Sequence, residues 1–230
     1  MAKKLLMVLP FMIIVGFFII DCSQNQATIV AKSTEELETQ NVMLIDKIRW
    51  RKQTIMIDAG HGGDDPGSVN RDVLEKTLNL EVALKLEKAL KKEGYKVIMT
   101  RSDDIGLGLY DRVKLANEAK VDLFISLHQN SFADSHVHGI EVFYNENKKS
   151  TQGKELAQLI QSTLVAETGA KNRGIRWDNK LVVTRETKMP ACLIEMAYIS
   201  NDAELALIQT DDYQNKVVKG IVKGVELFFE

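Results

Sequence analysis

The stretch Thr54-Ile-Met-Ile-Asp-Ala-Gly-His-Gly-Gly-Asp-Asp-Pro-Gly67 is the starting point for predicting the fold. Its first four residues are β-branched or apolar, and an aspartate and glycines end the run abruptly, which predicts a buried strand that runs into a loop. His61 lies on that loop between Gly60 and Gly62, so the backbone and the imidazole can both approach a ligand or ion closely. A single histidine cannot form a metal site, and an ordinary turn histidine explains this motif equally well. The interpretation therefore depends on partners elsewhere in the chain.

Helical and extended patterns alternate through the rest of the chain. Amphipathic helices are predicted over 76–92, 110–119, 155–167 and 217–228, and strands over 95–99, 123–127, 140–144, 181–184 and 192–196. This alternation favours a single α/β domain with a mainly parallel central sheet of about six strands, covered by helices on both faces. A chain of 230 residues with 45% hydrophobic residues suffices for one such domain and is short for two.

The N-terminus predicts export across the cytoplasmic membrane. Lys3 and Lys4 precede an uncharged apolar run, 5–20, which is typical of an export signal. The run is short for a membrane span and no Ala-x-Ala cleavage site follows, so residues 1–22 are either a cleaved signal or a membrane anchor, with lipidation of Cys22 as a third alternative. Residues 23–50 are interpreted as a polar spacer with room for one helix, and 51–230 as the catalytic domain. Membrane association is expected only through the N-terminal segment.

The charge balance argues against nucleic acid as a partner, and the cysteine content argues against a disulfide framework. Lys and Arg number 30 against 32 Asp and Glu, so no broad cationic field favours nucleic acid. The two cysteines, Cys22 and Cys192, lie in unrelated contexts and form no disulfide framework. Cys192 is expected to be a small buried apolar residue.

Four chemically suited side chains fall at predicted strand ends or helix starts. His61 follows the first strand, Glu75 precedes the first helix, and His128 follows the strand 123–127. Glu195 interrupts the otherwise apolar run Cys192-Leu-Ile-Glu-Met-Ala-Tyr-Ile199, where a carboxylate is costly to bury unless it is paired. In open α/β sheets the carboxyl ends of the strands are where sites form.

These residue types together indicate a catalytic metal. Two imidazoles and a carboxylate with an open fourth position suit zinc, and a second carboxylate nearby can transfer the proton of a bound water. Separately, Glu75 is also explained by helix capping and Glu195 by a solvated strand edge. His136 and His138 lie in a polar segment that is better interpreted as a surface loop.

Several motifs, in this order and spacing, resemble the zinc-dependent N-acetylmuramoyl-L-alanine amidases. They are Asp58-Ala-Gly-His-Gly-Gly63, Asp65-Pro-Gly67, Glu75-Lys76, Thr100-Arg101, Ser126-Leu-His-Gln-Asn130 and Glu195-Met-Ala-Tyr-Ile-Ser-Asn201. The similarity covers about residues 54–229, with Thr77 standing where an acidic residue is common. The resemblance implies one Zn²⁺ ion with ligands His61, Glu75 and His128, and Glu195 as the catalytic glutamate; it leaves the substrate-contact residues unknown.

The resemblance also implies a reaction and a setting. The family cleaves the amide between N-acetylmuramic acid and L-alanine of the stem peptide in peptidoglycan. The chain looks most like the spore-cortex amidases, which act in muramic-δ-lactam formation, sporulation and germination. It is therefore expected outside the cytoplasm, in the cell wall or the forespore intermembrane space. No wall-binding repeats flank the domain and the inserted helix that restrains some family members is missing, so an exported protein partner is expected to position or regulate it.

Two other functions remain open at this point. A zinc peptidase that cuts within the stem peptide would use the same metal chemistry on a different bond. A non-catalytic glycan-binding scaffold could retain the fold without turnover.

Overall fold

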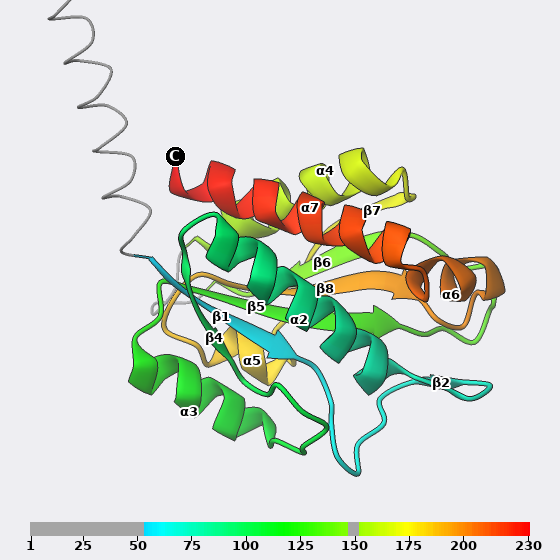
Figure 1. Ribbon diagram of the computed structural model, residues 1–230, viewed down its shortest axis with the longest axis horizontal. Helices are drawn as coiled ribbons and strands as arrows, with labels where there is room; N and C mark the ends of the chain where they lie inside the picture. Colours follow the sequence, from blue (N-terminus) through cyan, green and yellow to red (C-terminus); the bar gives the residue numbers. More distant parts are fainter. Residues whose placement is uncertain (1–52, 147–151) are drawn as a thin grey trace, which may run out of the picture. The chain divides into compact units, whose positions relative to one another are not determined.

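The computed structural model describes residues 53–146 and 152–230. These residues form one α/β domain with a central six-stranded sheet, which confirms the predicted fold (Figure 1). The sheet strands are β1 (Thr54–Ala59), β4 (Lys96–Met99), β5 (Leu123–Asn130), β6 (Ile140–Tyr144), β7 (Asn172–Trp177) and β8 (Ala191–Tyr198), while β2 (Val69–Asn70) and β3 (Val73–Leu74) form a separate hairpin. The helices are α2 (Glu75–Lys92), α3 (Leu109–Ala119), α4 (Gly153–Thr168), α5 (Val182–Arg185), α6 (Asp202–Ile208) and α7 (Asp211–Phe229).

The sheet is mainly parallel, with the strand order β4-β1-β5-β8-β6-β7. Strands β4, β1, β5 and β8 run in one direction, whereas β6 is antiparallel to β8 and parallel to β7. The carboxyl ends of β1, β5 and β8 therefore lie side by side at the same end of the sheet. Residues far apart in the sequence are brought together there.

Helices cover the two faces unequally. Helices α2, α4 and α7 pack over one face around a large apolar core, and α4 and α7 lie side by side (Figure 1). Helices α3 and α5 cover the other face with a smaller cluster that includes Met56, Val113, Phe124, Val183 and Leu193. The apolar cluster on this second face reaches only to Phe124 of β5 and Leu193 of β8, in the first halves of these strands. His128 and Glu195 belong to that face.

One predicted strand was wrong, and the sequence analysis missed one strand of the central sheet as well as the short hairpin of β2 and β3. Residues 181–184 lie at the start of α5, because Val183 is buried under the sheet and this packing outweighs the strand preference of β-branched residues. The Asp178 carboxylate accepts hydrogen bonds from the amides of Lys180 and Leu181 and turns the chain into this helix. Strand β7 was missed because it is an edge strand with polar residues on both sides.

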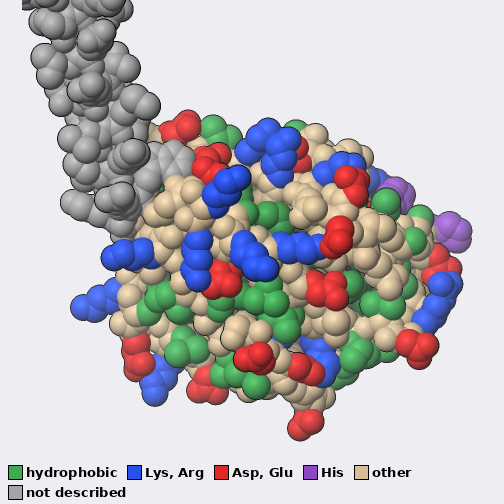
Figure 2. All heavy atoms as spheres, viewed as in Figure 1, with side chains coloured by type: hydrophobic (Ala, Val, Ile, Leu, Met, Phe, Trp, Pro, Cys, Tyr) green, Lys and Arg blue, Asp and Glu red, His purple; other side chains and the backbone are tan. Residues whose placement is uncertain are grey.

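The N-terminal predictions, 1–22 as signal or anchor and 23–50 as spacer, lie outside the described residues. None of the helices in 53–146 and 152–230 is long and apolar enough to cross a membrane. On the face shown in Figure 2, lysines and arginines are interspersed with aspartates and glutamates. This face has no broad patch of a single sign, in keeping with the formal net charge of -2.

Candidate active site

His61 lies on the tight loop that follows β1. Its φ is +61°, a left-handed value that is uncommon for a residue with a side chain. The next two residues, Gly62 and Gly63, also have positive φ, of +129° and +60°. The loop therefore needs outside contacts to hold His61 in this conformation.

Two buried arginines supply those contacts. Arg112 donates from Nη1 to the carbonyl of Ala59 at 2.8 Å and from Nη2 to the carbonyl of His61 at 2.7 Å. Arg101 donates to the intervening carbonyl of Gly60 at 3.0 Å and also to that of Ala59 at 2.9 Å. Three successive carbonyls of the loop are thus fixed by charged donors, which form stronger hydrogen bonds than neutral ones.

Asp58 neutralises Arg112 inside the protein. Both side chains are almost fully buried, and their closest atoms, Oδ1 and Nη1, are 2.5 Å apart. The Asp58 carboxylate also accepts hydrogen bonds from the hydroxyls of Thr100 and Ser126, each at 2.7 Å. A buried ion pair is tolerated when further hydrogen bonds satisfy both ions, and this pair meets that condition.

Glu75 stands at the first position of α2 and is buried. Its Oε1 lies 3.1 Å from Nε2 of His61 and 3.0 Å from Nδ1 of His128. Backbone amides of Ser68 and Gln129 also donate to this carboxylate, at 2.8 and 3.0 Å. Burial opposes ionisation of Glu75, but the hydrogen bonds and charges of His128 and His61 outweigh it and hold its pKa far below the ordinary value. Glu75 is therefore a carboxylate at neutral pH.

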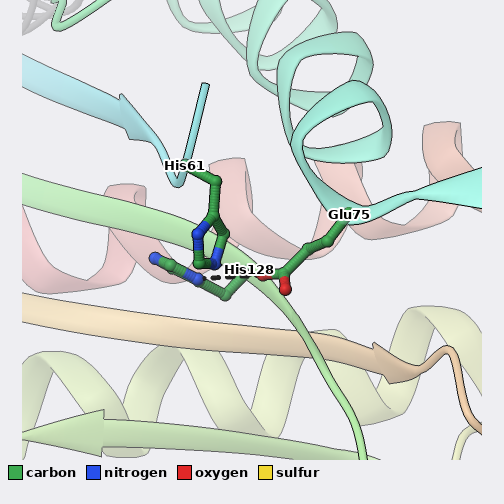
Figure 3. A group of neighbouring side chains, drawn as sticks. All are labelled: His61, Glu75 and His128. Atoms are coloured by element: carbon green, nitrogen blue, oxygen red, sulfur yellow. Dashed lines mark hydrogen bonds and ion pairs between the residues drawn. The ribbon is translucent and has the colours of Figure 1, made fainter. Parts of the chain in front are cut away.

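His61, Glu75 and His128 point toward one another (Figure 3). One ligand atom from each lies within 4.8 Å of the others, and the two imidazole rings meet edge to face at 4.9 Å between centroids. Two ring nitrogens and a carboxylate oxygen at this spacing fit a metal ion of the zinc type. His128 lies inside β5 rather than after its end, because this strand continues to Asn130.

Asp65 supports His61 from the outer side. Its carboxylate is 2.8 Å from Nδ1 of His61, while Nε2 faces Glu75. Metal-ligating histidines usually donate their second ring nitrogen to a carboxylate or carbonyl in this way, which fixes the ring and its tautomer. Burial lowers the pKa of His61, but the contacts with Glu75 and Asp65 outweigh this, so that its pKa is raised overall.

Two glycines leave the room that the three side chains occupy. A Cβ atom at Gly60 would lie 2.3 Å from Cε1 and Nε2 of the His128 ring. At Gly67 it would lie 2.6 Å from Oε2 of Glu75 and from Cδ2 of His61. Real Cβ atoms do not approach other atoms this closely, so the cluster requires glycine at both positions.

Glu195 lies in the middle of β8, directly opposite His128 on β5 and Glu141 on β6. Residues paired across neighbouring strands share one face of the sheet, so Glu195 projects on the same side as His128. Its Oε2 is inaccessible to solvent and has no hydrogen-bond partner among the described residues. Burial, together with the charges of Glu75 and Glu141, raises the pKa of Glu195 well above its ordinary value.

The two other histidines lie away from this cluster. His136 and His138 are exposed on the loop before β6, as predicted. His136 contacts the carboxylate of Asp134 at 2.9 Å, and His138 contacts the carbonyl of His136 at 2.8 Å.

Residues 55–227 match the family model described as N-acetylmuramoyl-L-alanine amidase. The chain belongs to this amidase family. It is an amidase that acts on the bond between N-acetylmuramic acid and L-alanine in peptidoglycan. The amidase is 33% identical to N-acetylmuramoyl-L-alanine amidase LytC of Bacillus subtilis over 177 residues, which are 77% of this chain and 36% of LytC. It therefore spans about a third of that longer protein.

Solved structures agree with the family and the fold. The catalytic domain of the amidase CwlV from Bacillus (Paenibacillus) polymyxa var. colistinus is 41% identical, with a TM-score of 0.72 over 76% of this chain and 97% of that one. The CwlD amidase from Clostridioides difficile, solved in complex with the GerS lipoprotein, is 31% identical, with a TM-score of 0.73 over 77% of this chain and 98% of that one.

The sequence predictions assigned no role to the residues that support the cluster. Asp65 follows His61 by four residues and could have been suspected from that spacing. Arg112 gave no signal, because it lies in an amphipathic helix where arginine is common. Only the fold shows that its guanidinium reaches under β1.

Proposed function

We propose that the amidase is zinc-dependent, with His61, Glu75 and His128 as the ligands of one ion and Glu195 as its catalytic base. The observation that supports this most directly is the convergence of the three side chains at hydrogen-bonding distances. Glu195 on the neighbouring strand adds a carboxylate on the same face. A bound zinc ion supplies Lewis-acid chemistry, since it lowers the pKa of a water ligand to about 7 and polarises a carbonyl oxygen.

Glu195 moves the proton in this proposal. It accepts the proton of the attacking water and delivers it to the nitrogen of the leaving L-alanine. Its raised pKa makes it a stronger base than an ordinary glutamate and a competent acid in the second step. Asp65 and the buried arginines orient His61 and do not themselves touch the substrate.

Metal content of purified variants tests the assignment. Replacing His61 or His128 by Ala should remove zinc and turnover together, because two remaining ligands do not retain the ion. Glu75→Gln should weaken zinc binding first, whereas Glu195→Gln should keep zinc and lose at least ~10²-fold in rate. A histidine variant with full zinc content and no activity would reassign that histidine to substrate contact. Absence of zinc from the wild type under all conditions would overturn the proposal.

Product analysis separates this reaction from the peptidase alternative. Mass spectrometry of digested peptidoglycan should show intact stem peptides with a free L-alanine terminus. Shortened stems would identify a peptidase, and no release of peptides at all would leave a glycan-binding scaffold.

The location of the enzyme in the cell and its protein partner are also part of the proposal. Residues 1–22 act as an export signal or membrane anchor, 23–50 as a spacer, and the catalytic domain works in the wall or the forespore intermembrane space. The motifs that resemble those of the spore-cortex amidases support a role in the spore cortex. The complex of the similar CwlD amidase with the GerS lipoprotein supports a protein partner for this chain. Expression in a spore former that lacks its cortex amidase should restore muramic-δ-lactam; restored vegetative lysis without the lactam would assign the enzyme to the vegetative wall.

A partner that binds only the metal-loaded domain would raise the apparent zinc affinity by mass action. The test measures zinc occupancy of residues 50–230 alone at physiological metal levels. Full occupancy and rapid, unselective cleavage would contradict the need for a partner.

A further inference from the structure

Polar side chains continue beyond Glu195 across the same face of the sheet. Glu141 of β6 is paired directly with Glu195, and β7 lies next to β6 at the edge of the sheet (Figure 1). Arg176 of β7 is opposite Phe143 and reaches back to contact the Glu141 carboxylate. A row of charged groups thus leads from the proposed base toward the sheet edge.

Glu141 is a fixed anion in this row. It is buried and accepts hydrogen bonds from Asn130 Nδ2 at 2.8 Å, from the hydroxyl of Tyr198 and from Nε of Arg176. Nε of Arg173 lies 3.7 Å from the same carboxylate. These donors hold the Glu141 carboxylate in place. The carboxylate in turn holds Arg176 of the edge strand β7.

The two arginines outnumber this carboxylate. Arg173 is largely enclosed, with its guanidinium 5.0 Å from the centre of the Tyr198 ring and its Nη1 3.4 Å from the carbonyl of His138. Together with Glu141, Arg173 and Arg176 leave one net positive charge beside the acidic pair of Glu75 and Glu195. An anionic group of a ligand would be attracted to this side of the site.

Arg176 is the arginine that can receive such a group. Its side chain is 49% exposed, and among the described residues only its Nε makes a hydrogen bond. Its two terminal nitrogens thus remain available to solvent. Guanidinium groups bind carboxylates with two parallel hydrogen bonds, and the bond from Nε to Glu141 restricts the orientation of this one.

We propose that Arg176 binds a free carboxylate of the stem peptide, on the acidic residue that follows L-alanine, and thereby determines specificity. The proposal rests on the proposed function, since it takes Glu195 to mark the scissile bond. Neighbouring strands are about 4.8 Å apart, and the Arg176 guanidinium lies against Glu141, one strand from Glu195. Two extended residues of a peptide span about 7 Å, so a carboxylate one residue beyond L-alanine can reach the guanidinium.

The test compares two muropeptides that differ only at this group. In one the second stem residue has a free carboxylate, and in the other the same group is a carboxamide. Wild-type enzyme should cleave the carboxylate form about tenfold better in kcat/KM, mainly through a lower KM, because a hydrogen-bonded charge pair is worth about that factor. Arg176→Gln should lose this preference, because kcat/KM should fall for the carboxylate substrate alone. Arg176→Lys should keep part of the preference.

A matched control removes one cation from the opposite face of the sheet. Lys219 on α7 is 62% exposed and pairs with Glu167, which Lys223 also contacts. Lys219→Gln should leave the preference between the two substrates unchanged. Equal cleavage of both substrates by the wild type, or an equal loss on both in Arg176→Gln, would overturn the subsite and leave the amidase proposal intact. Cleavage of neither substrate would overturn both.

Discussion

Replacing Gly60 by Ala should damage the candidate active site while leaving the fold intact. Gly60 does not have a positive φ, so its backbone conformation suits alanine. The added Cβ would lie 2.3 Å from the His128 ring, where ordinary contact begins at about 3.4 Å. The ring must therefore retreat by about 1.1 Å, which breaks its 3.0 Å contact with Glu75.

The size of the effect follows from this displacement. Loss of ligand orientation typically lowers metal affinity about 10- to 100-fold, and a misplacement of about 1 Å in a catalytic group can cost about 10²-fold in rate. Zinc affinity is measured by competition with a chelator, and turnover by release of stem peptides at saturating zinc. We expect both to fall in Gly60→Ala, with little change in the unfolding midpoint of the metal-free domain.

Gly169→Ala is the control for an effect on stability alone. Gly169 caps α4 with a φ of +70° and has nothing within 4 Å of an added Cβ. Alanine there should cost about 1 kcal/mol of stability through backbone strain and leave zinc affinity unchanged. Wild-type zinc affinity and turnover in Gly60→Ala would refute the argument that this glycine makes room for His128.

Three further predictions concern buried groups. Because the pKa of Glu195 is raised in the folded chain, its contribution to the stability of the metal-free domain is fully present below the ordinary glutamate pKa of 4.5 and is lost as pH rises from there through the raised value. Glu195→Gln should remove this contribution, so that the wild type loses stability relative to the variant in denaturant titrations from pH 4.5 to 8; parallel curves would contradict it. Arg112→Gln leaves the Asp58 carboxylate buried without its cation, so the free energy of unfolding measured by chemical denaturation should fall by about 3–5 kcal/mol. As a control, Lys114→Gln on the exposed side of the same helix should change it by less than about 0.5 kcal/mol. A Cβ at Gly220 of α7 would lie 2.9 Å from the backbone of Leu164 in α4. Gly220→Ala should therefore lower the free energy of unfolding by about 1–3 kcal/mol and leave the activity of the folded enzyme unchanged. An unchanged unfolding midpoint would show that the two helices can separate freely.

The alternating pattern of apolar runs was sufficient to predict the α/β domain and its sheet. The strand run 54–57 and the helix after Glu75 are visible locally, because burial of one face forces a periodicity that survives in the sequence. The chemical character of His61, Glu75, His128 and Glu195 was also evident, since histidines and carboxylates stand out beside apolar strands. Their sequence order and spacing further pointed to the amidase family, which the comparison of residues 55–227 confirms.

Only the tertiary structure brought these side chains to one point and supplied their supports. His61 and His128 meet because β1 and β5 are neighbouring parallel strands, and Glu195 faces His128 because β8 is next to β5 in the register observed. Strand order and register depend on long-range packing, which leaves no local pattern in the chain. For the same reason the sequence could not predict the Asp58–Arg112 pair, whose members are 54 residues apart, or the row of charged groups from Glu195 to Arg176. In the sequence, an arginine on a helix or an edge strand looks like a solvated charge. Only the fold places a carboxylate against it.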